Sequence, residues 1–351
     1  GSSDFIFKNQ FMRVEINPQT GDIARIWDEV NRREILRSAG NQLQAFQDGG
    51  QYWDAWNINP KYAEKPLPPS QLRSIEWIEK DPIRQRVRVV REIAGCEFQQ
   101  DYILDAHSPI LQIKTSVDWQ AEHVLVKANF PLNITADKAT SEIACGAIDR
   151  TTKPETAAER AKWEVPVHRW VDLTDNSGEY GVSLLNDCKY GCDTGTDYLR
   201  LTLLRSSSWP DPVADRGYHE FTYAIYPHPS TWQAAGTVRV GYELNSPLQI
   251  LQFPQQGAET IIDERKLAPT SSVIELNSQN LVLMAFKPSD RPAQEWVMRC
   301  YECHGMAGEI KLNGDLDLQI DRAVNLFDEP QDLLFDSIFK PWQIKSFGIK
   351  R

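Results

Sequence analysis

The feature that most constrains this fold is a series of short alternating segments separated by turn residues. Residues 11–16 and 23–28 alternate apolar and polar side chains on either side of the stretch Asn-Pro-Gln-Thr-Gly-Asp. Two alternating runs around such a turn predict a β-hairpin. Further strand-like segments follow at short intervals, at residues 72–79, 84–93, 98–104, 110–119 and 124–132. This spacing predicts an all-β chain.

Helical periodicity is scarce. The best candidate is residues 153–163, where a proline near the start and internal alanines predict a short helix or a loop. Several prolines between residues 245 and 269 interrupt the strand pattern and predict a domain boundary there. We therefore expect a large sandwich or supersandwich over residues 1–250 and a small β-sandwich over residues 251–351.

Charge and composition exclude some classes of partner. The 351 residues carry a net charge of −11 without a cluster of Lys and Arg, so a nucleic-acid surface is not expected. No stretch approaches the roughly 18 apolar residues of a membrane span. The opening Gly1-Ser2-Ser3 does not resemble a signal peptide but a remnant of an expression vector, so the natural N-terminus is expected to be missing. Six cysteines at this low density predict free thiols and a cytoplasmic protein.

Several ordered sequence blocks carry a family resemblance. They lie at residues 11–23, 40–46, 51–56, 181–191, 203–206, 219–228 and 341–347. Together they resemble the C-terminal region of bacterial-type α-mannosidases of glycoside hydrolase family 38, and the resemblance covers essentially the whole chain. It implies a supersandwich like that of galactose mutarotase followed by a small C-terminal β-sandwich.

The resemblance also implies a division of labour. In the family, an N-terminal α/β barrel carries the catalytic carboxylates and a zinc ion, and hydrolysis of terminal α-mannosides retains the anomeric configuration. We therefore expect a non-catalytic chain, inactive alone, with no catalytic or metal-binding residue of its own. Its expected partners are the upstream catalytic barrel of the same polypeptide and mannose-containing glycans. Zinc is expected only in the full-length enzyme.

One segment is dense in groups that suit a sugar. Tyr52, Trp53, Asp54 and Trp56 place three aromatic rings and a carboxylate within five residues. Aromatic rings stack on sugar faces and a carboxylate accepts from a hydroxyl, although such clusters also serve packing. By resemblance, Tyr52 and Arg205 match a tyrosine and an arginine that reach the edge of the barrel's active site, and Trp53 is an alternative to Tyr52.

Two further segments are candidates for the same rim. Asp187 and Lys189 lie in a polar segment after a strand, where they would either bind a sugar or cap a turn. Residues 206–217 form a Pro-containing loop next to Arg205, which we expect to dock against the barrel.

Two other functions stay open at this point. A free-standing carbohydrate-binding module would need an exposed platform of Trp or Tyr. An aldose epimerase-like enzyme would need a histidine and a carboxylate that converge in a concave pocket of the first sandwich.

Overall fold

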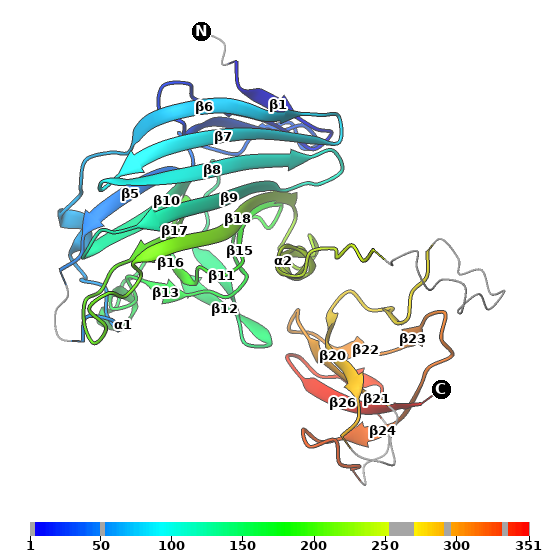
Figure 1. The fold of residues 1–351 in the computed structure, drawn as a ribbon. Coiled ribbons are helices and arrows are strands. Elements are labelled where there is room, and N and C mark those ends of the chain that lie inside the picture. The colour runs from blue at the N-terminus through cyan, green and yellow to red at the C-terminus, as the bar shows by residue number, and fades with distance from the viewer. Residues whose placement is uncertain (1–3, 50–52, 253–269, 291–295, 332–335, 351) are drawn as a thin grey trace. The chain divides into compact units, whose positions relative to one another are not determined.

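The computed structural model describes residues 4–49, 53–252, 270–290, 296–331 and 336–350. The chain divides into two compact units, one comprising Gly1–Glu142 with Ile148–Asn245, the other Ile143–Ala147 with Ser246–Arg351. Strands dominate both units, which confirms the all-β prediction (Figure 1). The strand predicted at residues 84–93 forms at those residues, and the other strands named above form within two residues of their expected limits.

The larger unit contains three antiparallel sheets. The nine-stranded sheet has the order β12 (Gly146–Thr151), β11 (Lys138–Ile143), β14 (Trp170–Thr174), β15 (Tyr180–Asn186), β18 (Gly217–Pro229), β9 (Leu111–Trp119), β8 (Cys96–Asp105), β7 (Arg84–Ile93) and β6 (Gln71–Lys80). The five-stranded sheet has the order β13 (Val165–Pro166), β16 (Gly191–Gly195), β17 (Tyr198–Arg205), β10 (Val124–Pro131) and β5 (Gln42–Gln47). The four-stranded sheet consists of β1 (Ile6–Lys8), β2 (Met12–Ile16), β3 (Ile23–Asp28) and β4 (Arg33–Glu34).

These sheets form the two layers of a β-supersandwich. Figure 1 shows β6, β7, β8, β9 and β18 side by side, with β5, β10 and β17 in a second layer. Alternation places one face of each strand inward, as in β9, where every second residue from Leu111 to Trp119 is buried. One apolar core joins all three sheets and contains, among others, Val14, Val89, Phe98, Phe130 and Leu184. Burial of such side chains supplies about 1.5–3 kcal/mol each.

A buried polar network crosses this apolar core. The Arg91 side chain is fully buried and its Nη1 lies 2.5 Å from Asp22 Oδ1. Asn41 donates to Tyr102 Oη at 2.7 Å and accepts from Tyr223 Oη at 2.6 Å. Burial without partners would cost several kcal/mol, so these hydrogen bonds fix how the layers meet.

Two helices and a 3-10 turn interrupt the strands of the larger unit. Within the predicted 153–163 segment, α1 spans only Ala157–Arg160, and Thr156 with Glu159 forms its capping box. The turn η1 spans Tyr62–Glu64. Helix α2 (Thr237–Asn245) was not predicted, because its β-branched residues and Gly241 disfavour a helix. Packing overrides this preference, since a Cβ at Gly241 would lie 3.2 Å from Trp170 Cδ1.

The smaller unit is a set of short antiparallel strands around its own core. Its four-stranded sheet has the order β20 (Leu281–Pro288), β21 (Trp296–Glu302), β26 (Ile344–Lys350) and β24 (Gln319–Val324). Two-stranded sheets pair β19 (Glu275–Leu276) with β23 (Leu312–Asn313) and β22 (Gly308–Glu309) with β25 (Ile338–Phe339). The core includes Met298, Cys300, Phe339 and Phe347. None of the six cysteines, all of which lie within the described residues, forms a disulfide.

Candidate functional site

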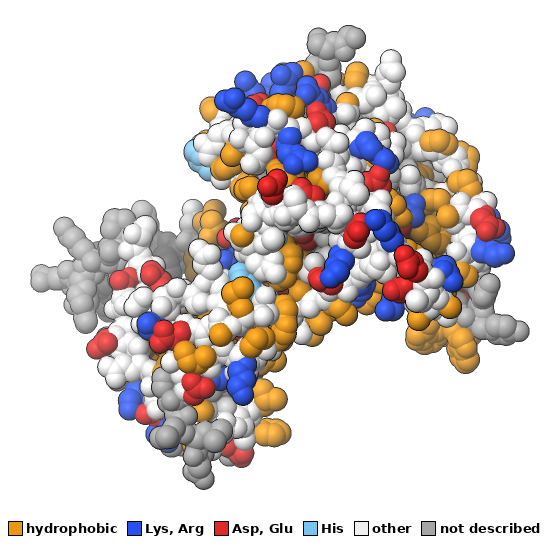
Figure 2. All heavy atoms as spheres, turned by 180° about the vertical axis from the view of Figure 1, so that it is seen from behind, with side chains coloured by type: hydrophobic (Ala, Val, Ile, Leu, Met, Phe, Trp, Pro, Cys, Tyr) orange, Lys and Arg blue, Asp and Glu red, His pale blue; other side chains and the backbone are white. Residues whose placement is uncertain are grey.

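Three tryptophans form an exposed aromatic cluster on the larger unit, which we call the indole platform. Trp53, Trp56 and Trp209 are 62%, 65% and 49% exposed, and their ring centroids lie 5.6–6.2 Å apart. Large aromatic side chains gathered in solvent mark a contact surface rather than ordinary surface scatter. Figure 2 shows hydrophobic side chains exposed in groups on this unit. The platform combines the predicted Trp53 and Trp56 with Trp209, which was not among the residues predicted from the sequence.

Arg205 holds together the two loops that carry the platform. It lies at the end of β17, and its Nε is 2.5 Å from Asp48 Oδ2, just after β5. Its two terminal nitrogens donate to the backbone carbonyls of Asp54 and Asn57, and Nη2 lies 3.4 Å from Asp54 Oδ1. A planar guanidinium suits such a fork of acceptors. Arg205 thus fastens residues 54–57 to the strand that leads into the Trp209 loop.

A β-bulge decides which way Arg205 points. In β17, Tyr198, Arg200 and Thr202 are half-buried on one face, while Leu199 and Leu201 are buried on the other. The register with β10 then slips by one residue, and both Leu203 and Leu204 are buried. An extra residue of this kind reverses the alternation beyond it. Arg205 therefore lies on the same face as Arg200 and Thr202.

Asp54 and His123 complete the support of the platform. Asp54 is buried, and its Oδ2 accepts from the Ser208 backbone N–H at 2.7 Å. His123 Nε2 lies 2.8 Å from Ser208 Oγ, and its Nδ1 lies 3.8 Å from Asp54 Oδ2. The Ala55 N–H also donates to the Trp209 carbonyl at 3.1 Å. The two loops are thus joined through side chains and backbone alike.

This geometry changes the roles that the predicted residues can take. Asp54 and Arg205 are each engaged by the protein's own groups, so they position the platform rather than offer free polar groups. Trp53 and Trp56 present the accessible surface. Tyr52 lies outside the described residues. Asp48, His123 and Ser208 could not be found from the sequence, because nothing local marks a residue that meets a partner more than 80 positions away.

Asp187 and Lys189 contact different neighbouring residues. Asp187 Oδ2 accepts from the Thr222 N–H at 2.8 Å, which fixes the chain after β15 to β18. Lys189 Nζ lies 4.5 Å from the Phe221 ring centroid, within range of a cation–π contact. Burial lowers the pKa of Lys189, which attraction to Asp215 and Asp187 partly offsets. The two side chains form no ion pair with each other in the described structure.

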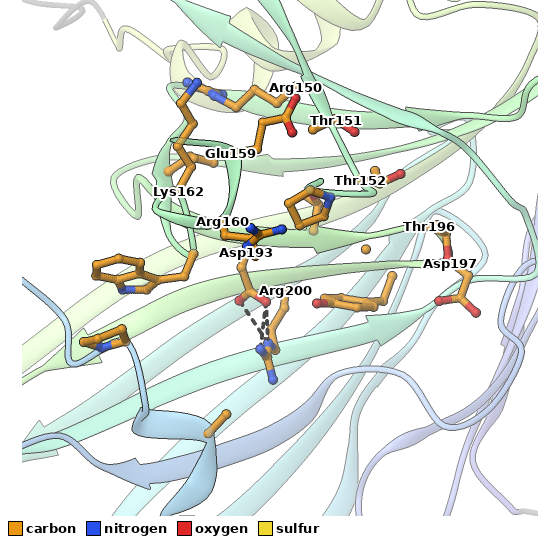
Figure 3. A pocket seen from close by; sticks show the side chains of 18 of the residues that line it. Arg150, Thr151, Thr152, Glu159, Arg160, Lys162, Asp193, Thr196, Asp197 and Arg200 are labelled. Carbon is orange, nitrogen blue, oxygen red and sulfur yellow. Dashed lines mark hydrogen bonds and ion pairs between the residues drawn. The ribbon is translucent and has the colours of Figure 1, made fainter. Parts of the chain in front are cut away.

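A cavity of about 830 Å³ lies on the outer face of the five-stranded sheet (Figure 3). Its floor includes Asp193 and Arg200 from β16 and β17. Its walls come from the end of β12, from residues 159–165 around α1, and from the turn η1. No histidine is among the residues that line this cavity.

Paired charges support the cavity floor. Lys127 is fully buried, with Nζ 2.5 Å from both Glu164 Oε2 and Asp193 Oδ1. Arg200 binds the Asp193 carboxylate through Nε at 2.9 Å and Nη2 at 2.7 Å, and donates to Tyr62 Oη at 2.9 Å. Burial raises the pKa of Asp193, but attraction to Lys127 and Arg200 outweighs burial and lowers it overall. The sequence reading missed this group, whose members are far apart along the chain.

Two kinds of feature are absent from the described part of the chain. Across residues 4–350, outside the gaps stated above, no three His, Cys, Asp or Glu side chains are grouped so that they could hold a metal ion. In the same portion of the chain, no helix has the length and apolarity needed to cross a membrane.

Two protein-family models match the chain. Residues 7–213 match the model described as glycosyl hydrolases family 38 C-terminal domain. Residues 280–347 match the model described as glycosyl hydrolases family 38 C-terminal beta sandwich domain. The first match lies in the larger unit except for residues 143–147, and the second lies in the smaller unit.

Relatives and solved structures agree with these matches. The chain is 32% identical to alpha-mannosidase 2C1 of Mus musculus over 352 residues, which covers 96% of the chain and 33% of the relative. It is 33% identical to alpha-mannosidase G of Dictyostelium discoideum, covering 87% of the chain and 28% of the relative. The chain thus spans about a third of the length of these relatives. An alpha-mannosidase structure from Enterococcus faecalis V583 shares the fold, with a TM-score of 0.80 at 14% identity, over 98% of this chain and 42% of that one.

Proposed function

Because the chain belongs to glycosyl hydrolase family 38, as a C-terminal region of that family, we propose that it is the non-catalytic part of a retaining α-mannosidase. In this proposal it supports an upstream catalytic barrel of the same polypeptide and lines the rim of that barrel's sugar site. The proposed substrates are terminal α-mannosides of mannose-containing glycans, and the proposed location is the cytoplasm. The relatives extend well beyond the matched region, which leaves room for such a barrel.

The observation that carries the rim proposal is the indole platform. Trp53, Trp56 and Trp209 stay exposed although their loops are fastened by Arg205 and Asp54. Ordered loops that present apolar rings lose little conformational freedom when they bind a sugar face or a protein surface. We therefore assign contact with the substrate or barrel to the three indoles and a positioning role to Arg205.

We assign no zinc-binding residue to this chain. Zinc in proteins takes a compact set of His, Cys, Asp or Glu side chains, and the described residues offer no group of three. The zinc expected for the full enzyme is therefore proposed to bind upstream.

The decisive experiment compares two lengths of the protein. Hydrolysis of an aryl α-mannoside is measured with added zinc for the 351-residue chain and for the chain joined to its natural upstream sequence. We expect activity in the longer protein only. Zinc-dependent hydrolysis by the 351-residue chain itself would overturn the non-catalytic assignment.

A second experiment tests the rim role within the longer protein. Trp56→Ala is expected to raise KM or lower kcat/KM by about tenfold, since one well-packed aromatic contact supplies about 1–2 kcal/mol. Tyr218→Ala is the matched control, because Tyr218 is 70% exposed and lies outside the platform. Unchanged kinetics for both Trp56→Ala and Trp209→Ala would remove the platform from the rim.

The same platform favours one alternative, a carbohydrate-binding module. That function predicts that the 351-residue chain alone binds mannobiose or mannan, and that Trp56→Ala abolishes this binding. The epimerase alternative receives no comparable support, because the cavity on the five-stranded sheet has no histidine in its lining. His123 does approach Asp54, but both side chains support the loops described above.

A further inference from the structure

The lining of the cavity on the five-stranded sheet contains four cations and four carboxylates, but most of these carboxylates have cationic partners outside the lining. Its acids are engaged: Asp193 with Lys127 and Arg200, Asp197 with Arg37, and Asp149 with Lys138 at 3.7 Å. The Glu159 carboxylate accepts from the backbone N–H groups of residues 155 and 156, although Lys162 also attracts it. The carboxylates of the lining are thus already engaged, in part by cations that lie outside the cavity.

Three cations of the lining lack a matching carboxylate. Arg150 donates through Nη2 to the Pro166 carbonyl at 3.1 Å, while its buried Nη1 has no hydrogen-bond partner. Arg160 donates only to the carbonyl of residue 155, and Lys162 makes no side-chain hydrogen bond or ion pair with any described residue. Figure 3 shows the ends of the Arg150 and Lys162 side chains turned toward each other on the same wall. Two such cations suit a phosphate or a carboxylate.

The rest of the lining suits a sugar ring. Trp163, Tyr62 and Tyr198 contribute aromatic surface, and the Tyr198 ring lies so close over Gly195 that a Cβ there would be 2.2 Å from it. Thr194 and Thr196 also line the cavity, and neither hydroxyl has a side-chain hydrogen bond within the described residues. Aromatic faces with a few free polar groups are the usual lining of ligand pockets, and 830 Å³ lies within their usual size range.

We propose that this cavity binds a small anionic carbohydrate, a hexose that bears a phosphate or a carboxylate. Arg150 and Lys162 hold the anionic group, and the hexose ring lies against Tyr198 and the threonine hydroxyls. The paired charges beneath the floor keep Asp193 and Arg200 in place. This site is separate from the indole platform and does not depend on the rim role proposed for the indoles.

Calorimetric titration of the 351-residue chain tests the proposal. Glucose 6-phosphate, glucuronate, glucose and inorganic phosphate are the probes, so that ring and charge are varied separately. We expect at least one of the two anionic sugars to bind at least tenfold more tightly than glucose and than inorganic phosphate. The comparison of glucose 6-phosphate with glucuronate tells which anionic group is preferred.

Charge-removing variants locate the binding. Arg150→Gln with Lys162→Gln is expected to weaken binding of the preferred anionic sugar at least tenfold, which corresponds to about 1.4 kcal/mol. Arg73→Gln with Lys80→Gln removes the same charge from β6 and should leave the affinity unchanged. Lys162→Gln alone, at an exposed side chain, is expected to weaken binding about threefold and does not depend on tolerance of the Arg150 change.

Several outcomes would overturn the proposal. Absence of binding by both anionic sugars would do so, as would glucose binding as tightly as they do. Inorganic phosphate binding as tightly as glucose 6-phosphate would exclude a role for the sugar ring. Equal affinities for the native chain and both cavity variants would place the binding elsewhere.

Discussion

Arg205 and Asp48 form an ion pair across the ends of β17 and β5, with Nε 2.5 Å from Oδ2 and exposed side-chain fractions of 13% and 0%. The pair joins residues 157 positions apart in the sequence. Both loops of the indole platform leave the sheet at this point. The pair therefore connects the stability of the larger unit with the placement of its exposed tryptophans.

Loss of the Arg205 side chain should destabilise the larger unit. Arg205→Met leaves Asp48 buried without a cation, and removal of one partner from such a pair costs about 3 kcal/mol. Urea unfolding followed by tryptophan fluorescence measures the loss. Arg73→Met removes an exposed partner of Glu92 and should change the free energy of unfolding by less than about 1 kcal/mol. Equal effects of the two variants would contradict the role given to Arg205.

Loss of the Lys127 side chain should also destabilise the larger unit. Burial lowers the pKa of this amine, but attraction to Glu164 and Asp193 outweighs burial and raises it, so Lys127 stays charged. Lys127→Met would remove the ion-pair partner of the buried Glu164 and leave Asp193 with Arg200 alone, at a cost of about 3–5 kcal/mol. Chemical denaturation at pH 7 measures this cost. Lys127→Met with Glu164→Gln should recover part of the loss, and a double variant no more stable than Lys127→Met would argue against the coupling.

Asp101 gives the larger unit a defined pH dependence. Burial raises the pKa of Asp101, but hydrogen bonds from Arg88 and Arg86 outweigh burial and lower it below its usual value. A lowered pKa in the folded state adds stability that is complete above the unfolded-state pKa of about 3.9. That stability is lost as the pH falls from there through the folded-state pKa.

Asp101→Asn tests this dependence. The variant should be about 2 kcal/mol less stable than the native chain at pH 7, and the difference should shrink below about pH 4. Unfolding curves at several pH values between 7 and 3 measure it. Asp118→Asn, at an exposed position on β9, is the control and should change little at any pH. A difference that stays constant down to pH 3 would refute the electrostatic origin.

Gly195 is required for the shape of the cavity. A methyl group at this position would overlap the Tyr198 ring, so Gly195→Ala must displace that ring at a cost of about 1–3 kcal/mol. Thermal unfolding measures the destabilisation. Gly49→Ala is the matched control, because a Cβ there meets no atom within 4 Å. Equal thermal stability of Gly195→Ala and Gly49→Ala would contradict the close packing of the Tyr198 ring on Gly195.

The sequence predicted what depends on local pattern. Strand β7 was expected at its observed limits because its residues alternate and a turn precedes them. Helix α2 was missed, since packing against Trp170 outweighs the poor helix preference of its residues. Trp53 and Trp56 were identified as candidates by their density. Trp209 joins them only through the fold, so no local signal linked it to them.

The supporting roles of Asp54 and Arg205 could not be predicted from the sequence either. The sequence showed a carboxylate among aromatic rings and an arginine beside a loop, which suits a sugar site. It could not show that Arg205 is engaged by Asp48 and by two backbone carbonyls, because that depends on how β5, β10 and β17 are paired. The bulge in β17 also changes the face on which Arg205 lies, and simple alternation does not predict this change.

The bulge in β17 exchanges the odd-numbered and even-numbered positions that face outward. Before it, even-numbered residues such as Arg200 and Thr202 face outward; after it, the odd-numbered Arg205 does. Regular alternation over the same three-residue step would instead turn residue 205 toward the apolar core and remove its bond to the loops. A homologue one residue shorter between Thr202 and Arg205 would have no bulge, and plain alternation would keep its arginine on the outer face. When family members are aligned, a bulged three-residue step and an unbulged two-residue step therefore place the arginine on the same face of the strand.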